Sequence, residues 1–152
     1  MNIGISIVYL IKAVIFGIAT VILIPKEQYK KYFIYGFFTG GVANVLVVSI
    51  FSYLNFIKYC NMGPFAVFDT FAFFTPIAWT FTMMLFLYFL PVRKVFFFPY
   101  VISFALFAVA VGEVLEGFGL YEYSIYLMPF VFIAWFSLTA FVYMRNEKIK
   151  LI

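Results

Sequence analysis

The positively charged residues of this chain are grouped in a pattern that only a membrane protein requires. Eight of the ten lysines and arginines fall into three clusters, and long apolar stretches separate one cluster from the next. The clusters are Lys26, Lys30 and Lys31; Arg93 and Lys94; and Arg145, Lys148 and Lys150. Basic residues beside membrane-crossing helices are retained on the cytoplasmic side. The alternation therefore predicts how often the chain crosses a bilayer, and in which orientation.

The composition indicates that lipid surrounds most of the chain. Hydrophobic residues make up 67% of the sequence and charged residues 11%, whereas an average soluble domain is roughly half apolar and about a quarter charged. The net charge is +4, and the basic residues that produce it flank apolar stretches instead of forming a patch. We interpret it as the bias of a membrane protein with some attraction to membrane lipids, and predict no nucleic-acid partner. The single cysteine, Cys60, excludes an internal disulfide framework.

Five apolar segments are long enough to cross the roughly 30 Å of bilayer hydrocarbon, which takes about 20 helical residues. They are about 3–24, 32–54, 65–90, 95–116 and 124–144. The sequence therefore predicts one all-α domain over 1–152, an integral membrane bundle of five transmembrane helices with its N-terminus outside and its C-terminus cytoplasmic. The first segment carries Lys12 and lacks a cleavage site, so we interpret it as a span and not as a signal peptide.

Four ionisable residues fall within these spans, where charges are costly and face protein or water. Lys12 lies about 14 Å along its helix from Ile3, at 1.5 Å per residue, and Asp69, Glu113 and Glu116 lie in the outer half. Three interpretations remain open. The charges form an ion pair that fixes helix packing, or Lys12 extends outward to the interface while the glutamates are hydrated, or the group is a functional ion or ligand site.

Glu113 and Glu116 are three residues apart and share a helix face, so one of the pair is expected to hold its proton. Glu116 also lies on the same side as a ridge of small residues, Ala105, Ala108 and Gly112. Since small residues let neighbouring helices approach closely, we expect the glutamates to face the interior of the bundle.

The third segment carries a stripe at spacings of three and four, formed by Asp69, Ala72, Pro76, Trp79 and Met83. Trp79 at mid-depth suggests a cavity wall, or else a large side chain in the core or against lipid. Pro76 is expected to kink this helix.

The second segment carries Gly36 and Gly40 in a GxxxG spacing, with Asn44 one turn further on near the same side. This pattern is typical either of packing against another helix of the same chain or of a homodimer or other membrane-protein contact through Gly36 and Gly40. Asn44 at this depth needs a hydrogen-bond partner.

Absent residue types narrow the chemistry. The chain has no histidine, which removes histidine-based acid–base catalysis, histidine haem ligation and the common zinc sites. A hard cation held by Asp69 with Glu113 or Glu116 would need further oxygens from water or backbone. We predict no catalytic residue, no cofactor and no metal.

Short motifs give a family resemblance. They are Ile24-Pro25-Lys26, Phe74-Thr75-Pro76, Tyr88-Phe89-Leu90-Pro91, and Glu113 followed by Gly119-Leu120-Tyr121 and an apolar fifth span. Over about 23–143 the chain resembles the small five-span membrane proteins of spore-forming Gram-positive bacteria, a group without an assigned activity. The resemblance implies a multi-pass protein of the bacterial inner (plasma) membrane and implies no catalytic residue.

Three functions remain in order of preference. The first is a structural or regulatory partner within the bilayer, with no enzymatic activity. The alternative is a small transporter or ligand-binding bundle that uses the charged cluster of the outer half, with candidate residues Lys12, Asn44, Asp69, Trp79, Glu113 and Glu116. An enzyme acting on lipid or isoprenoid substrates comes third.

Overall fold

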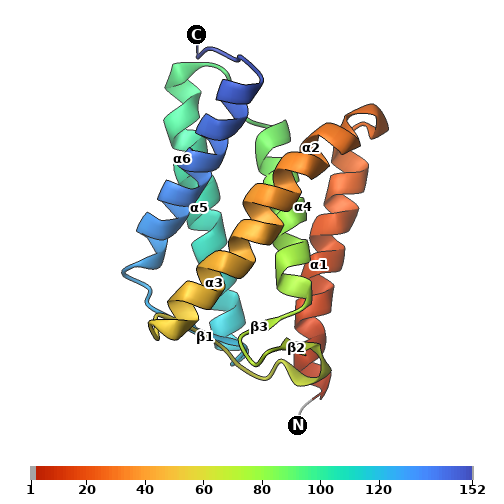
Figure 1. Cartoon of the computed structure of the whole chain (residues 1–152), viewed down its shortest axis with the longest axis vertical. Helices are drawn as coiled ribbons and strands as arrows, with labels where there is room; N and C mark the ends of the chain where they lie inside the picture. The colour runs from red at the N-terminus through yellow and green to blue at the C-terminus, as the bar shows by residue number, and fades with distance from the viewer. Residues whose placement is uncertain (1–2, 152) are drawn as a thin grey trace.

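The computed structural model describes residues 3–151 and shows a bundle along which the chain passes five times, alternating in direction (Figure 1). The helices are α1 (Ile3–Leu23), α2 (Tyr29–Gly36), α3 (Ala43–Tyr53), α4 (Phe74–Tyr88), α5 (Lys94–Gly117) and α6 (Met128–Asn146). Short 3-10 turns, η1 (Lys26–Gln28) and η3 (Gly63–Phe65), precede α2 and β2. The two ends of the chain lie at opposite ends of the bundle.

A π-helical segment, η2 (Phe37–Val42), joins α2 to α3, so that one continuous helical pass runs over Lys26–Tyr53. The predicted helix over 32–54 therefore has a π segment in its middle. A π turn leaves backbone carbonyls free of their usual partners. The carbonyl of Thr39 in this segment accepts a hydrogen bond of 2.7 Å from the indole N–H of Trp135 on α6, which ties the second pass to the last.

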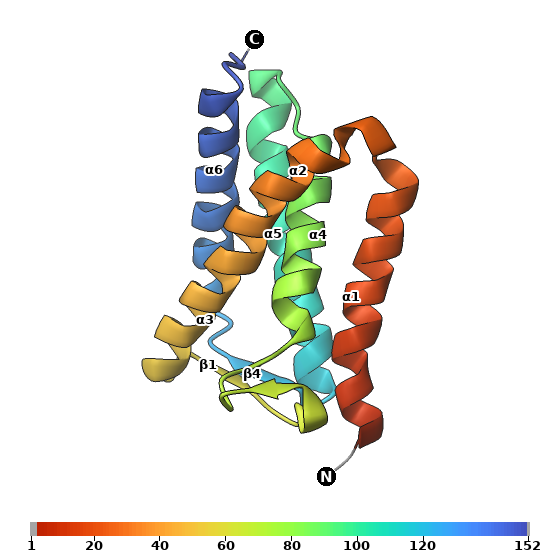
Figure 2. The ribbon, with the colours of Figure 1, turned by 45° about the vertical axis from the view of Figure 1, so that its right-hand side comes forward.

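Helix α4 stands at the centre, with α1 on one side and α2–α3 crossing it on another (Figure 2). Its side chains are buried almost all round, and the fully buried Phe86 contacts the rings of Phe104 on α5 and Phe136 on α6, at centroid distances of 5.2 and 4.7 Å. A helix that is apolar on every face belongs in the interior of a bundle. Helix α4 is therefore the core around which the other passes pack.

The helix predicted over 65–90 is shorter than expected. Residues before Phe74 form a small antiparallel hairpin of β2 (Ala66–Val67) and β3 (Phe71–Ala72), and its tip places Phe68 and Asp69 at positive φ. That left-handed backbone cannot continue an α-helix. Because α4 begins at Phe74, Pro76 lies in its first turn, where a missing N–H costs no helical hydrogen bond. The expected kink at Pro76 is therefore wrong.

Glycines on the second pass allow the backbone of α4 to pack closely against that of α2 and η2. A Cβ added to Gly36 would lie 2.7 Å from the carbonyl oxygen of Thr80, and one added to Gly40 would overlap the carbonyl of Trp79. Both glycines are buried. The GxxxG face is thus covered by α4 of the same chain, and a homodimer would have to use another surface.

A two-stranded antiparallel sheet closes one end of the bundle, which we call the strand end. Strand β1 (Ile57–Tyr59) pairs with β4 (Tyr121–Tyr123), so two connections that the sequence showed only as loops are joined. The hydroxyl of the fully buried Tyr9 on α1 lies against the carbonyl oxygens of Cys60, at 2.9 Å, and of Leu120. These contacts fasten α1 to both strands.

The opposite end carries the three clusters of basic residues, and we call it the basic end. There the ammonium of Lys31 lies 2.6 Å from the carboxylate of Glu147, which also accepts a hydrogen bond of 3.1 Å from the hydroxyl of Tyr35. The Lys31 ammonium lies 5.3 Å from the ring centre of Tyr143. The hydrogen bond from Lys31 lowers the pKa of Glu147, so the carboxylate that links α2 to the end of α6 stays charged at neutral pH.

Four helical segments in the described part of the chain are long and apolar enough to cross a membrane: Gly4–Leu23, Lys26–Tyr53, Lys94–Gly117 and Met128–Asn146. Large apolar side chains on their outer faces are exposed, among them Ile22 at 73% and Phe130 at 72%. Such surfaces require lipid around them. The protein is therefore mostly helical and membrane-embedded.

We predict that Gly40→Ala destabilises the bundle by about 1–3 kcal/mol, because the clash is with backbone that cannot move aside. Thermal melting in mild detergent measures this. Gly4→Ala is the matched control, since a Cβ there meets nothing within 4 Å and alanine favours a helix by about 0.5–1 kcal/mol. Equal melting temperatures for Gly40→Ala and the wild type would contradict the close approach of α4.

Candidate functional site

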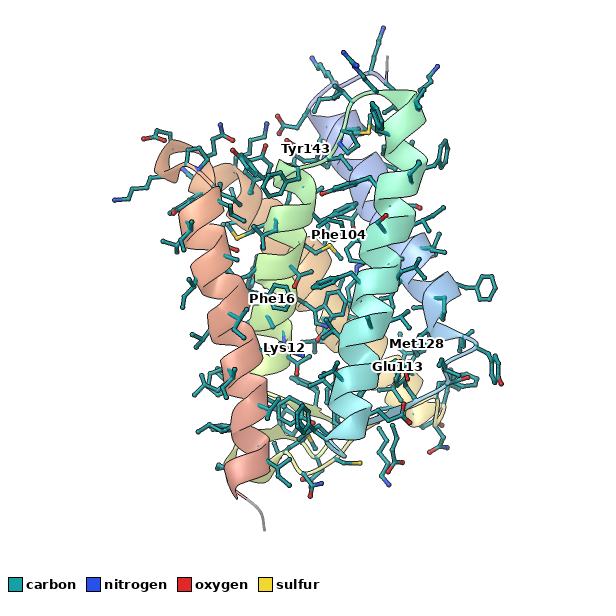
Figure 3. The ribbon with its side chains drawn as sticks, turned by 180° about the vertical axis from the view of Figure 1, so that it is seen from behind. Lys12, Phe16, Phe104, Glu113, Met128 and Tyr143 are labelled. Atoms are coloured by element: carbon teal, nitrogen blue, oxygen red, sulfur yellow. The ribbon has the colours of Figure 1, made fainter. Side chains whose placement is uncertain are left out.

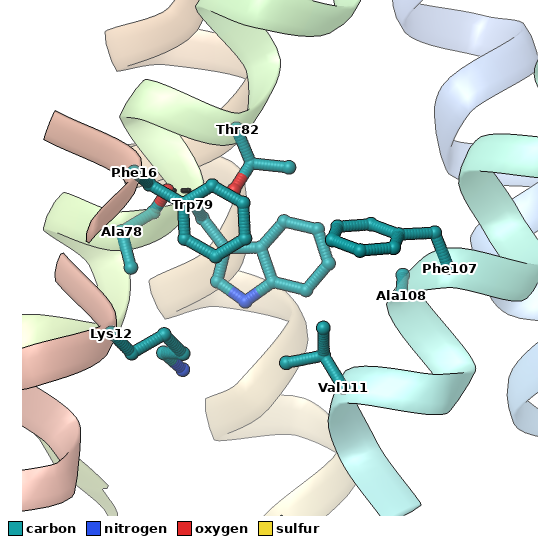
Figure 4. A pocket seen from close by; sticks show the side chains of 8 residues that line it. All are labelled: Lys12, Phe16, Ala78, Trp79, Thr82, Phe107, Ala108 and Val111. Atoms are coloured by element: carbon teal, nitrogen blue, oxygen red, sulfur yellow. Dashed lines mark hydrogen bonds between the residues drawn. The ribbon is translucent and has the colours of Figure 1, made fainter. Parts of the chain in front are cut away.

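Lys12 reaches from the middle of α1 into a cavity between α1, α4 and α5 (Figure 3). The cavity has a volume of about 30 Å³, enough for at least one water molecule. Its lining is otherwise apolar or aromatic except for Thr82 (Figure 4): Phe16, Ala78, Trp79, Thr82, Phe107, Ala108 and Val111. An ammonium group thus lies in an aromatic pocket at membrane depth.

The expected ion pair of Lys12 with Asp69 or Glu113 is not formed. Among residues 3–151 the ion pairs are Lys31 with Glu147 and Lys58 with Glu122, and no acidic side chain interacts with the Lys12 ammonium. The outward extension of Lys12 to the interface is not seen either, since its side chain lines the internal cavity. Lys12 thus lines the cavity without an acidic partner among residues 3–151.

Asp69 lies away from the site because it is not on a helix. It occupies the tip of the β2–β3 hairpin at the strand end, with an exposed side chain and a φ of 53°. The stripe predicted to join Asp69 and Ala72 with Pro76, Trp79 and Met83 therefore breaks before Phe74, and only its last three members share α4.

Glu113 and Glu116 are both exposed, which corrects the expectation that they face the interior. The ridge of Ala105, Ala108 and Gly112 is buried as expected. However, the ring of Tyr123 covers Gly112, 3.2 Å from where a Cβ would lie, and its hydroxyl donates to Glu113. Strand β4 thus takes the place near this face that the glutamates were expected to fill, and in Figure 3 Glu113 lies on the far side of α5 from Lys12.

Trp79 separates the Lys12 cavity from a second one. Its ring stacks on Trp135 and Phe132 of α6, at centroid distances of 5.0 and 5.4 Å, and it lines both cavities. The indole nitrogen forms no hydrogen bond with a described residue, and in Figure 4 it lies on the same side of the cavity as the Lys12 ammonium. Trp79 therefore lines two cavities and also packs against α6, and its indole N–H is without a hydrogen-bond partner within residues 3–151.

Asn44 faces the second cavity, which has a volume of about 20 Å³ and lies between α3, α4, α6 and the strand layer. The side chain is only 2% exposed, and its carbonyl oxygen has no hydrogen-bond partner. The rings of Tyr59 and Tyr121 lie on the same cavity. The partner that the sequence required for Asn44 is thus not supplied by the described protein groups, and a bound water molecule fits the space.

The polar side chains that line the Lys12 cavity are those of Lys12, Trp79 and Thr82. No group of three or more acidic or cysteine side chains that could hold a metal ion occurs within the described range. The hydroxyl of Thr82 donates to the carbonyl of Ala78, 2.8 Å away. Lys12 and Trp79 are hydrogen-bond donors, so the Lys12 cavity favours a group with acceptor oxygens and negative charge.

Some residues of the site were missed in the sequence. Phe16 is four residues after Lys12 and Thr82 three after Trp79, so each shares a helix face with a predicted site residue. That spacing was the available signal. Phe107 and Val111 carry no comparable signal, because only the packing of α5 beside α4 brings them to the cavity.

Comparison of the chain with protein-family models, with curated proteins and with solved structures finds no match in any of the three.

We predict that Lys12→Met stabilises the folded protein by about 1–3 kcal/mol, because an unpaired charge at this depth is costly. The melting temperature in ligand-free detergent should rise, whereas Lys30→Met, at an exposed lysine of the basic end, should leave it nearly unchanged. A fall for Lys12→Met would show that Lys12 has a stabilising protein partner.

Proposed function

We propose that the protein crosses the plasma membrane five times, with the strand end outside and the basic end in the cytoplasm. Eight of its basic residues belong to segments at the basic end, and only Lys58 lies in the strand layer. Short cytoplasmic connections carry this excess of lysine and arginine. The orientation places the N-terminus outside and the C-terminus inside.

In this arrangement α4 is the third crossing along the chain and adds to the four crossings by the long helical segments. Its 15 residues extend about 22 Å at 1.5 Å per residue, less than the hydrocarbon thickness. However, other helices surround it, so its length need not match the bilayer. The hairpin before Phe74 is exposed at its tip, where Phe68 is 93% exposed, so we place it at the outer surface of the bilayer and not in the hydrocarbon.

We further propose that the bundle binds an anionic ligand within the bilayer beside Lys12. The observation that carries this proposal is the ammonium group of Lys12, which lines a cavity and has no acidic partner within residues 3–151. Charged residues inside membranes are costly and mark ligand or ion pathways. This function uses Lys12 and Trp79 and dispenses with Asp69, Glu113 and Glu116. The cavity favours it over a purely structural or regulatory partner, which needs no charge at this position.

Cys60, the only cysteine, tests the orientation. A membrane-impermeant maleimide added to intact cells should label it. Burial, together with the carboxylate of Glu122 that accepts a hydrogen bond from the thiol, raises the pKa of Cys60. The thiolate is the reactive form, so labelling should be slow at neutral pH and accelerate as the pH rises.

The matched control is Lys148→Cys in a Cys60→Ser chain, which should be labelled only after the membrane is permeabilised. Labelling of this control in intact cells, together with no labelling of Cys60 in the wild type, would reverse the proposed orientation.

Ligand binding is tested by purifying the protein from native membranes in mild detergent and weighing it by native mass spectrometry. The wild type should carry an adduct that is lost in Lys12→Met and kept in Lys12→Arg, because arginine retains the charge. Identical spectra for wild type and Lys12→Met would contradict the function.

A further inference from the structure

We propose that the ligand of the Lys12 cavity is a hydrophobic monocarboxylic acid, such as a fatty acid, that enters sideways from the lipid between α1 and α5. This inference rests on the proposed function and specifies its ligand class. It depends on three features of the cavity: where it opens, which donors it offers, and what can reach it through hydrocarbon.

Side chains of α1 and α5 line two sides of the cavity: Lys12 and Phe16 from α1, and Phe107, Ala108 and Val111 from α5. Helix α1 packs mainly along α4, and α5 mainly along α6. Across the gap, the rings of Phe16 and Phe107 meet edge to face with their centroids 6.2 Å apart. Phe107 is 48% exposed, so it stands at the mouth. Because this ring pair bridges the two helices, rotation of the two side chains would open a route from the bilayer.

Two donors match the two oxygens of a carboxylate. The ammonium of Lys12 supplies the charge, and the indole N–H of Trp79, free of other hydrogen bonds, supplies a second contact. The hydroxyl of Thr82 donates to a backbone carbonyl of α4, so it does not compete with Lys12 and Trp79 for the carboxylate. Lysine binds as a single point charge, so the neutral donor of Trp79 is what orients the carboxylate.

The route through lipid selects a carboxylic acid among anions. A carboxylic acid can cross hydrocarbon as the uncharged acid, with a solution pKa close to those of Asp and Glu side chains, about 4. On binding, the acid releases its proton to water and its carboxylate pairs with the Lys12 ammonium, so the pair has no net charge. A phosphate monoester keeps at least one negative charge at neutral pH, and its burial in hydrocarbon is costly.

The tail of the acid needs no enclosed pocket. Ile11 and Ile15 flank Lys12 on α1 and are 48% and 59% exposed, so apolar helix surface continues from the cavity into the bilayer. A chain lying against this surface stays among lipid tails while its head group enters past Phe16. The small volume of the cavity, about 30 Å³, therefore suits a head group and excludes a whole lipid.

The test uses the whole chain, stripped of bound lipid and placed in nanodiscs of phosphatidylcholine. Binding of radiolabelled dodecanoate is compared with dodecanol and dodecyl phosphate, which share its chain length. Dodecanoate should bind saturably. Lys12→Met should weaken it about 10- to 100-fold, as expected for the loss of a charge-assisted hydrogen bond. Trp79→Phe should weaken it about 3- to 10-fold, because it loses one neutral hydrogen bond.

Controls separate this inference from the function on which it rests. Lys30→Met, which removes a lysine far from the cavity, should bind dodecanoate like the wild type, and dodecanol binding should not depend on Lys12. If dodecyl phosphate binds through Lys12 and dodecanoate does not, the ligand class is wrong and the anion site stands. If no anion depends on Lys12, both proposals fail.

Discussion

The close approach of α4 to the glycine face of the second pass is the contact on which the structure depends. Gly36, Gly40 and Gly41 are buried, and a side chain at any of them would collide with α4. In a membrane, where lipid tails are as apolar as leucine, helices associate through close packing rather than through a hydrophobic driving force. The glycines make such packing available to a helix too short to span the bilayer alone. With α4 fixed at the centre, α1, α5 and α6 have a common surface.

The position of α4 also determines the Lys12 cavity. Ala78, Trp79 and Thr82 form its floor, while Lys12 and Phe107 come from helices that do not pack extensively against each other. The two stacked tryptophans and the hydrogen bond from Trp135 to the π segment hold Trp79 in place. The cavity is thus a consequence of how three helices meet, and the charge inside it is maintained despite its cost to folding.

The strand layer and the Lys31–Glu147 pair each fasten helices together at one end of the bundle. Tyr9 joins α1 to both strands at one end, and Glu147 links α2 to the end of α6 at the other. Each contact joins segments more than 50 residues apart in the sequence. Together they fix the ends of the helices, and between these ends the rings of Phe16 and Phe107 meet across α1 and α5.

The sequence by itself determined that the chain is mostly helical and membrane-embedded, because long apolar stretches and clustered basic residues have few other physical solutions. It also identified Lys12, Trp79 and Asn44 as residues out of place at membrane depth, and those three line cavities in the structure.

Tertiary structure decided which of the candidate residues lie together. Asp69 lies outside the site because it is at the left-handed tip of a hairpin that precedes α4. Glu113 and Glu116 are exposed, and Tyr123 of β4 covers the face at Gly112 instead. Pairing between Ile57–Tyr59 and Tyr121–Tyr123 joins segments about sixty residues apart, and local sequence patterns do not record such contacts. The spacing of residues along one helix is local and can be read from sequence, whereas the neighbours of a face depend on packing of the whole chain.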